Sequence, residues 1–395
     1  MSLYMASVTR RARPARLRGL CALVLAWALA GCANLEYYAQ SIAGHSSLLQ
    51  AARPLDQVLA DPATPDDLRT RLRYAQSARR YASQELGLPD NGSYTQYADV
   101  KRPYVVWNVF ATPELSLRLK PSCFLIVGCI DYRGYYNEDE ARRAAQALRE
   151  QGWDVHVGGV PAYSTLGWYA DPLVNTFIRL PPGEVARLVF HELTHQAVYA
   201  KNDTAFNESL ATAVEQIGVE RWLNEPEHRA LRPAYEAFDR RRRDFVELLL
   251  ETRRQLAQAY GEAGARQGPA PTSPEPVNLT PEEVERRRAR KAEIIADLRQ
   301  RYERLKRDKW EGFSGYDGWF AQSLNNAHFA AIGTYHQWVP ALRAMADRCE
   351  PCRSGSLAPF LEQARALARL PYAERRRLLR EETERVQGTR LSSAP

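Results

Sequence analysis

The chain has 395 residues, of which 45% are hydrophobic and 26% are charged, and its formal net charge is +7. This apolar fraction is ordinary for a globular protein, and the length suffices for one elaborated domain or two small ones. Residues 1–31 contain five arginines and no acidic residue, so their removal lowers the net charge from +7 to +2. So small a positive surplus gives no basis for a nucleic-acid partner.

The first 31 residues resemble the signal peptide of a bacterial lipoprotein. A basic segment with the five arginines precedes a short apolar run, Leu20–Ala30, which ends in the lipobox-like sequence Leu29-Ala-Gly-Cys32. We therefore expect removal of residues 1–31 and lipidation of Cys32; an ordinary signal peptide with a chance cysteine is the alternative. Because Ala33 follows the cysteine, we expect an anchor in the outer membrane, facing the periplasm. No later apolar stretch is long enough to span a bilayer.

The four cysteines beyond Cys32 suit an oxidising compartment. Cys349 and Cys352 have CxxC spacing, but the sequence shows neither a thioredoxin-like unit around them nor the second CxxC of a zinc ribbon. We therefore expect structural disulfides, and we favour the pairs Cys123–Cys129 and Cys349–Cys352. The sequence alone does not fix this pairing.

Three parts are predicted in the mature chain, residues 32–225, 226–310 and 311–395. The first part begins with helices up to residue 86 and continues with one helix among short β-branched or aromatic runs that indicate strands. The helix is expected at residues 138–150, and the strands at residues 104–110, 123–127, 153–157 and 176–180. We therefore predict a helix-rich α+β fold with a small, mostly antiparallel sheet.

The second part is predicted to be a helical hairpin. Two long polar helical segments, residues 232–260 and 281–309, are joined by a proline-rich linker at residues 261–280. Their arginine runs have acidic residues nearby, which is typical of solvated helix faces; contact with phospholipid head groups is the alternative. The third part returns to helices that complete the main domain.

A buried helix over residues 184–201 is predicted to carry the pattern His191-Glu-x-x-His195. Residues four apart lie on one face of a helix, so both imidazoles can bind the same metal ion. Glu192 is then placed to hold and deprotonate a metal-bound water. The alternative is an ordinary helix with two surface histidines and a salt-bridging glutamate.

A zinc site of this kind needs a third protein ligand and leaves a fourth position for water. Glu208 lies thirteen residues after His195, a separation that suits a short loop and a second, antiparallel helix that begins near Thr204. Glu215, two turns further along the same face, is the competing ligand. Glu215 could instead be an outer acid that orients a ligating histidine.

Several segments together resemble one family, the bacterial lipoproteins known as predicted aminopeptidases. These segments are residues 132–135, 163–168, 171–173, 191–196, 206–208, 325–327 and 334–336. The resemblance covers most of the mature chain and implies a zincin-like core and a gluzincin-type zinc metallopeptidase that acts on peptides. It also implies that Zn²⁺ is held by His191, His195 and Glu208, with Glu192 as catalytic base. The Met-Glu-Asn segment with which large gluzincin aminopeptidases grip the amino group is missing, so aminopeptidase and endopeptidase activity both stay open.

A zinc peptidase also needs a hydrogen-bond donor for the oxyanion that forms at the substrate carbonyl. Tyr335 is our candidate and His336 the second; a buried tyrosine with a satisfied hydroxyl is the alternative. Residues 161–168, including Tyr163, are a candidate edge or wall for an extended substrate, or a plain strand and turn. No obligate protein partner is inferred. The competing interpretation of the whole chain is a lipid-anchored envelope protein with a non-catalytic zinc or peptide-binding site.

Overall fold

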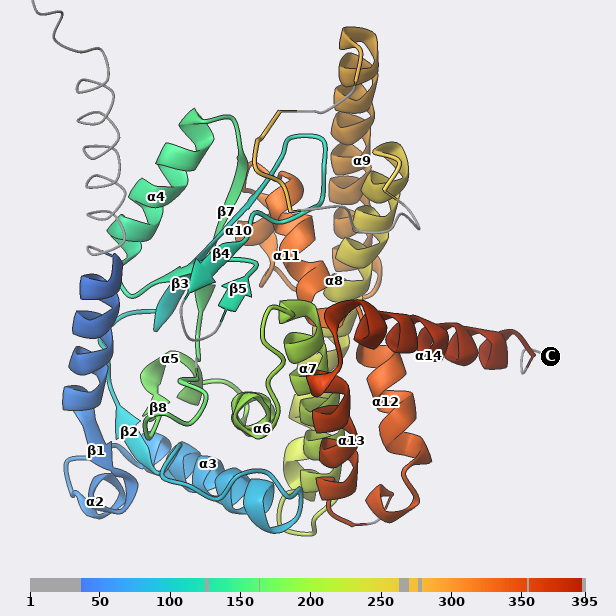
Figure 1. Ribbon diagram of the computed structural model, residues 1–395. Helices are drawn as coiled ribbons and strands as arrows, with labels where there is room; N and C mark the ends of the chain where they lie inside the picture. The colour runs from blue at the N-terminus through green and yellow to red at the C-terminus, as the bar shows by residue number, and fades with distance from the viewer. Residues whose placement is uncertain are drawn as a thin grey trace, which may run out of the picture. The chain divides into compact units, whose positions relative to one another are not determined.

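The computed structural model describes residues 37–124, 128–162, 164–262, 270–275, 279–353 and 355–392 (Figure 1). The expected lipidation site Cys32 and the candidate Tyr163 lie outside the described residues. Internal contacts divide the chain into two units, Met1–Ser47 and Leu48–Pro395, and the second unit contains every feature discussed below. Among the helices that the structure describes, none is both long and apolar enough to cross a membrane.

The second unit begins with short elements that support the central helices. β1 (Ala52–Pro54) pairs antiparallel with β2 (Gln96–Ala98), and β2 pairs parallel with β8 (Leu173–Val174). α2 (Leu55–Ala60) and the longer α3 (Asp66–Gln84) lie between β1 and β2 in the sequence. Two aspartates in the first turn of α3 complement its helix dipole, and its buried face packs against α6.

The main sheet has three antiparallel strands in the order β6–β3–β7. These strands are β3 (Val106–Thr112), β6 (Arg133–Tyr135) and β7 (Asp154–Val160). All seven residues of β3 are buried, because α4 (Glu138–Glu150) packs on one side of this sheet and α11 (Asn326–His336) on the other (Figure 1). A strand buried on both sides has a continuous apolar sequence, so period-two alternation is weak in β3.

One predicted strand is wrong. Residues 176–180 lie in the short helix α5 (Asn175–Ile178) and the turn that follows, and only Leu173–Val174 just before them pair as β8. The β-branched residues led to the error, because a run of five residues is too short for its periodicity to separate strand from helix. The Thr176 hydroxyl donates to the Pro161 carbonyl, and Phe177 and Ile178 are buried in the core.

The centre of the unit is the packed pair α6 (Pro182–Ala197) and α7 (Thr204–Trp222), which are joined by a short loop; in Figure 1 α6 is seen nearly end-on and α7 lengthwise, so the two helices cross rather than lie antiparallel as predicted. α6 begins with a proline at its first position, where the missing N–H costs nothing, and it ends four residues before the predicted end. α7 begins at the cap Asp203, which accepts a hydrogen bond from the backbone N–H of Phe206. The packed face of the pair includes Phe190, Phe206 and Leu210, all fully buried, and α3, α11 and α12 pack around it.

The predicted helical hairpin is present as α8 (Arg232–Ala259) and α9 (Pro281–Asp308), which lie side by side in Figure 1. The two helices have their own apolar cluster, which is distinct from the main core. Its most deeply buried members include Leu256, Leu298 and Tyr302. α11 also packs on α8, so the hairpin is attached to the helix that crosses the main sheet.

The remaining helices follow α7 in the sequence. They are η1 (Arg229–Leu231), α10 (Asp317–Phe320), α12 (Val339–Arg348), η2 (Glu350–Cys352), α13 (Ala358–Arg369) and α14 (Tyr372–Ser392). The main anchor of α14 is the buried ion pair of Arg375 with Asp203, the cap of α7, at 2.8 Å. The start of the glutamate helix and the end of the chain are therefore fixed to each other.

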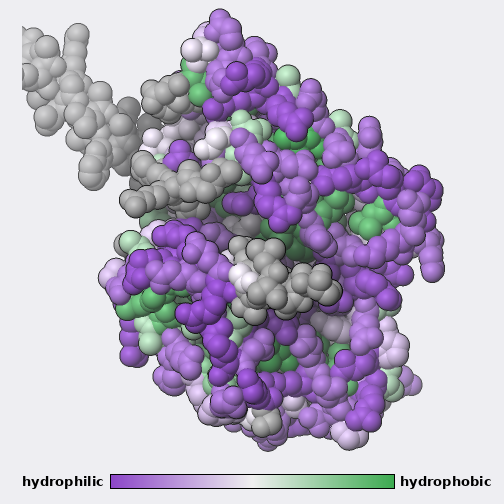
Figure 2. Space-filling model, turned by 90° about the vertical axis from the view of Figure 1, so that its right-hand side faces the viewer, coloured by the Kyte–Doolittle hydropathy of each residue, from purple (hydrophilic) through white to green (hydrophobic). Residues whose placement is uncertain are grey.

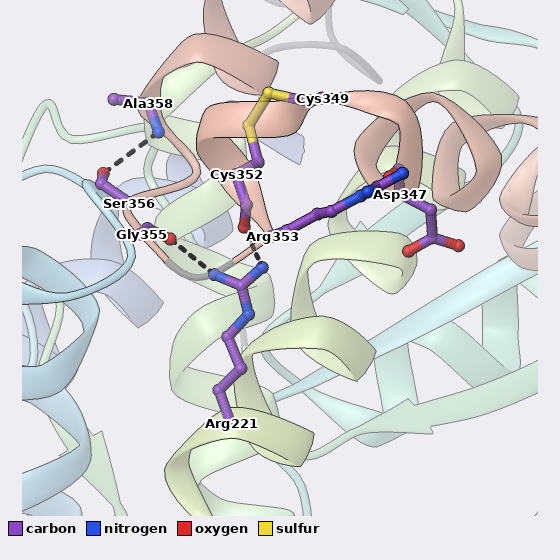
Figure 3. The surroundings of a disulfide bond; sticks show 8 residues. All are labelled: Arg221, Asp347, Cys349, Cys352, Arg353, Gly355, Ser356 and Ala358. Carbon is purple, nitrogen blue, oxygen red and sulfur yellow. Dashed lines mark hydrogen bonds between the residues drawn. A yellow bond between two sulfur atoms is a disulfide. The ribbon is translucent and has the colours of Figure 1, made fainter.

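Both disulfides pair as the sequence favoured. Cys123 and Cys129 are opposite each other in the hairpin of β4 (Ser122–Phe124) and β5 (Gly128–Ile130), and Cys349 bonds to Cys352. Arg221 of α7 donates hydrogen bonds to the carbonyls of Cys352 and Gly355, which anchors this CxxC turn (Figure 3). Cys349 and Cys352 are 6% and 0% exposed, so this bond has a structural position rather than that of an accessible redox centre.

The described part of the chain is therefore a helix-rich α+β protein with small sheets in which antiparallel pairing predominates. On the face shown in Figure 2 the surface is mainly hydrophilic, and apolar residues form separate patches between charged and polar ones. The aromatic side chains with the greatest exposure are Trp168 and Tyr169, at 70% and 55%. They belong to the turn that precedes β8.

Candidate metal centre

Three side chains from α6 and α7 converge in the middle of the unit. His191 Nε2 lies 3.2 Å from His195 Nε2 and 3.2 Å from Glu208 Oε2, and His195 Nε2 lies 3.5 Å from the same oxygen. Four tetrahedral ligands at ordinary zinc distances of about 2.0–2.2 Å are separated from one another by about 3.3–3.6 Å. The spacing of these three atoms therefore fits a single tetrahedral ion. The structure brings together the three residues that the sequence placed in this role.

The electrostatics of this group also fit a bound cation. The three side chains are only 9–11% exposed, so their charges are poorly screened by solvent. Burial favours the neutral form of Glu208, but positive charge on His195 and hydrogen bonds from both histidines lower the pKa of Glu208 to about 2. A carboxylate that stays ionised between two imidazoles is a ligand set typical of zinc in enzymes.

Glu215 does not share the ligand position. Its Oε2 lies 2.8 Å from His191 Nδ1, the ring nitrogen that faces away from Glu208, and its Oε1 accepts from Arg187 at 2.7 Å. Burial favours the neutral form of Glu215, but the charge of Arg187 and the bond from His191 lower the pKa of Glu215 to about 2. A carboxylate in this position fixes the tautomer and the orientation of the ligating imidazole. Of the two roles that the sequence left open for Glu215, the geometry favours the orienting one.

Arg187 is the positively charged partner of Glu215. It lies on α6, one turn before His191, and it also donates to Glu184 at 2.8 Å. Both glutamate side chains are only 1% exposed. Arg187 thus compensates two carboxylates that would otherwise be buried without a counter-charge. Arg187 was not predicted from the sequence, although it lies four residues before His191 on the same helix, a spacing that places both on one face.

Glu192 is also a buried carboxylate beside the metal ligands, but it has no counter-charge of the kind that Arg187 provides. It is 8% exposed, and the described residues offer its carboxylate neither a hydrogen bond nor an ion pair. Burial raises the pKa of Glu192, and the neighbouring histidines lower it only in part. A carboxylate with a raised pKa and no fixed partner is better suited to accept a proton than an ordinary carboxylate.

Two tyrosines face the acidic side of the centre from other elements. Tyr335, on α11, and Tyr132, just before β6, both interact electrostatically with Glu208 and Glu192. Burial and these negative charges raise the pKa of each hydroxyl well above its ordinary value, so both remain protonated donors. Tyr335 was predicted from the sequence and Tyr132 was not, although Tyr132 lies in a segment that resembles the family. Tyr199, just after α6, was missed too; burial and then Glu208 raise its pKa to about 12.

His336 faces a different part of the molecule. It lines a groove with Arg242 and Glu247 of α8, and burial lowers its pKa to about 4. Adjacent residues on a helix project about 100° apart, so Tyr335 and His336 leave α11 in different directions. His336 interacts electrostatically with Glu215 and His191, on the outer side of the metal centre. The two alternatives for an oxyanion donor are therefore on different sides of the helix.

The segment at residues 161–168 forms a turn and contains no strand among its described residues. Asp171 fixes this turn, because its carboxylate accepts from the backbone N–H of Thr165 at 2.9 Å and from the hydroxyl at 3.1 Å. Asp171 also interacts electrostatically with Glu192, so the turn lies beside the metal centre. The prediction of an edge strand here is wrong for the described residues, whereas a wall beside the site agrees with the geometry.

Comparison with known proteins places the chain in a family. A family model described as "Putative aminopeptidase" matches residues 36–379, a span that includes the metal centre and both tyrosines. The search of curated proteins and the search of solved structures found no match. Because the family model covers most of its length, the chain belongs to this aminopeptidase family.

Proposed function

We propose that the chain is a zinc-dependent metallopeptidase with a zincin-like core made of the β6–β3–β7 sheet, α6 and α7. The observation that carries the proposal is the buried group of His191, His195 and Glu208 at tetrahedral spacing, with Glu192 beside it. The family supports a peptide substrate. The two histidine nitrogens of the site favour zinc over the harder ions Mg²⁺ and Ca²⁺, which prefer oxygen ligands.

In the proposed mechanism, each residue has one task. A bound zinc ion would lower the pKa of a water and polarise the scissile carbonyl. Glu192 takes the proton of the attacking water and transfers it to the leaving amine, which its lack of fixed partners permits. Glu215 holds the His191 ring in place through Nδ1. Tyr335, Tyr132 or both donate a hydrogen bond to the oxygen that becomes negatively charged.

We further propose that the protein is lipidated at Cys32 and is anchored in the outer membrane, where it faces the periplasm. The support for this is the order of basic segment, apolar run and lipobox-like sequence in residues 1–32. The two disulfides agree with an oxidising compartment. Fractionation of the two membranes tests this location, and recovery of the protein only from the inner membrane contradicts it.

The first test of the function is to measure zinc content and peptide hydrolysis on the same preparation of the full chain. We expect one zinc per chain, and hydrolysis of a peptide library that disappears on chelation and returns with zinc. The Glu208→Ala variant should lose both zinc and activity. Stoichiometric zinc without hydrolysis would favour the alternative, an envelope protein with a non-catalytic site. A chain that binds no zinc would contradict the proposal.

A further inference from the structure

A cavity of about 290 Å³ lies beside the metal centre. Its walls come from the first turn of α7, from α11, from α8 and from the residues after β5. Asp131, on the last of these, interacts electrostatically with the ligand Glu208, so this part of the cavity is close to the metal centre. None of the three ligand residues lines the cavity, but its walls at Asp131 and at the first turn of α7 are close to Glu208, so the cavity can hold a part of a substrate near the metal centre.

Arg253 of α8 brings a positive charge to this cavity. Its guanidinium lies flat against α11 at Gly333, where a Cβ atom would be only 2.5 Å from Nε. Nε is buried without a hydrogen bond, and within the described ranges the guanidinium has no ion pair. Glu262, which attracts it electrostatically, already accepts from the Ser116 hydroxyl and the backbone N–H of Leu117. Arg253 is thus a half-buried charge without a counter-charge.

Asp131 brings the opposite charge. It follows the disulfide hairpin, which is fixed to the α6–α7 loop because the backbone N–H of Cys129 donates to Asn202 Oδ1 at 2.7 Å. Burial, then the nearby carboxylates of Asp203 and Glu208, raise the pKa of Asp131 to about 6. Within the part of the chain that the structure describes, its carboxylate has no hydrogen bond and no ion pair. Asp131 is thus a second half-buried charge without a direct partner, although the Arg376 guanidinium attracts it electrostatically.

Asp203, which also lines this cavity, is compensated, because it pairs with Arg375 at 2.8 Å and caps α7. The Arg376 guanidinium contacts the neutral Tyr372 hydroxyl and attracts Asp131 electrostatically. Leaving a charged group away from water without a partner is costly, so such groups are rarely retained without a use. Arg253 and Asp131 line one cavity with opposite charges yet form no ion pair with each other. A ligand with a positive and a negative end would compensate both.

We propose that this cavity binds the two charged ends of a zwitterionic ligand, with an α-ammonium on Asp131 and a carboxylate on Arg253. The cavity volume lies at the lower end of the range for small-molecule pockets, about 300–1,000 Å³, so the ligand is the size of a short peptide. The inference rests on the proposed peptidase function and specifies its substrates as short peptides with both ends free. Asp131 then supplies the recognition of a free amino group for which the sequence showed no residue.

Binding to an inactive enzyme tests this inference separately from catalysis. The probe is L-alanyl-L-alanine, titrated calorimetrically into the zinc-loaded full chain with the Glu192→Gln substitution. Its N-acetyl form and its C-terminal amide are titrated in parallel. Hydrogen bonds to charged groups contribute about 1.5–3 kcal/mol, so we expect each blocked form to bind about 10- to 100-fold more weakly than the free dipeptide. Equal affinity for the three forms, or no binding of the free dipeptide, overturns the proposal.

Variants assign each end to its residue. Arg253→Gln should lower the affinity for the free dipeptide to that of its amide, and it should leave the affinity for the amide unchanged. Asp131→Asn should lower the affinity for the free dipeptide to that of its N-acetyl form, and it should leave the affinity for the N-acetyl form unchanged. Gly333→Ala should act like Arg253→Gln, because its methyl group displaces the guanidinium. The matched control is Arg254→Gln, since this neighbouring arginine is 68% exposed and pairs with Glu251. An effect of Arg254→Gln equal to that of Arg253→Gln contradicts the assignment.

The active enzyme separates failure of this inference from failure of the proposed function. Hydrolysis of peptides that are blocked at both ends, at the same rate as free ones, overturns the zwitterion site and leaves the peptidase intact. Selective binding of the free dipeptide without any hydrolysis supports the site and contradicts only the peptidase.

Discussion

Glu192 and Glu215 are both buried carboxylates beside His191, but their surroundings differ. Glu215 accepts from His191 and Arg187, so both of its oxygens are occupied. Glu192 has no partner in the described structure, and burial raises its pKa. The first environment fixes an orientation, and the second permits proton transfer. Substitutions of the two residues should therefore affect different quantities.

Glu192→Gln should lower kcat/KM by at least about 100-fold, because general acid–base catalysis contributes about 10²- to 10⁴-fold and the amide cannot accept the proton. Zinc content should stay the same, since the carboxylate is not among the three ligand groups. Steady-state kinetics and metal analysis on the same sample measure both. Glu220→Gln, on the exposed side of α7, is the control. Full activity of Glu192→Gln would remove this residue from the role of base.

Glu215→Gln should mainly weaken the metal site. The amide oxygen can still accept from His191 Nδ1, but the negative charge that makes the ring a better ligand is lost, and Arg187 loses one counter-charge. Substitution of such an outer partner lowers metal affinity by about 10- to 100-fold. A competition titration with a chelator measures the change against Glu220→Gln on the same helix. An unchanged affinity would show that Glu215 does not orient the ligand.

A comparison of Tyr335→Phe with Tyr132→Phe should show which tyrosine donates the hydrogen bond to the oxyanion. Removal of one such donor costs about 10²- to 10³-fold in kcat, while substrate binding changes little. The tyrosine that donates should show this loss in kcat at nearly constant KM, and its double variant with Glu192→Gln should show little further loss. If neither substitution lowers kcat, the donor is a different group.

At the scale of elements, the local pattern was sufficient for the central helices. The spacing of His191, His195 and Glu208 predicted two helices joined by a short loop, and α6, the loop and α7 are present, although the helices cross rather than lie antiparallel. The long helices α4, α8 and α9 also agree closely with their predicted bounds, because amphipathic patterns over many turns leave little ambiguity. The error at α5 arose because a single helical turn is too short to show a clear periodic pattern.

What the sequence could not predict is the set of residues that long-range contacts bring to the site. Tyr132 and Asp131 reach it because Asn202 fixes the disulfide hairpin to the α6–α7 loop. Arg253 reaches the cavity because α11 packs on α8 and has a glycine at the contact. Asn326 supports this arrangement by donating from its buried amide to the carbonyls of Glu114 and Ser116. None of these contacts leaves a periodic signal in the sequence.

The cap of α7 gives a prediction at this scale. Asp203 is 1% exposed in its side chain and pairs with Arg375, so Asp203→Asn leaves a buried guanidinium without its counter-charge. Breaking a buried pair in this way costs about 3–5 kcal/mol. Urea unfolding should show a loss of that size, and Asp67→Asn in an exposed pair of α3 should cost less than about 1 kcal/mol. Equal losses in the two variants would contradict a special role for the buried pair.

At the scale of the whole molecule, the metal centre joins parts of the chain that have separate apolar cores. α6 and α7 belong to the main core, while the helical hairpin α8–α9 has a second one. α11 links them, because it contacts α7, α8 and the main sheet, and it carries Tyr335. The site therefore depends on the packing of the complete second unit rather than on the α6–α7 pair alone.

Metal binding should consequently stabilise the folded chain as a whole. The three ligands come together only when the α6–α7 loop and both helices are formed, so the unfolded chain binds zinc weakly and the native state gains most of the binding free energy. At a free zinc concentration of about 100 times Kd, this linkage adds about 2.7 kcal/mol to the free energy of unfolding. Urea unfolding in zinc-buffered solution measures the gain, and the Glu208→Ala variant is the control that should lose most of it. A gain of the same size in that variant would mean that zinc stabilises the chain at a different place, and no gain in the wild-type chain would show that the folded centre does not hold the ion.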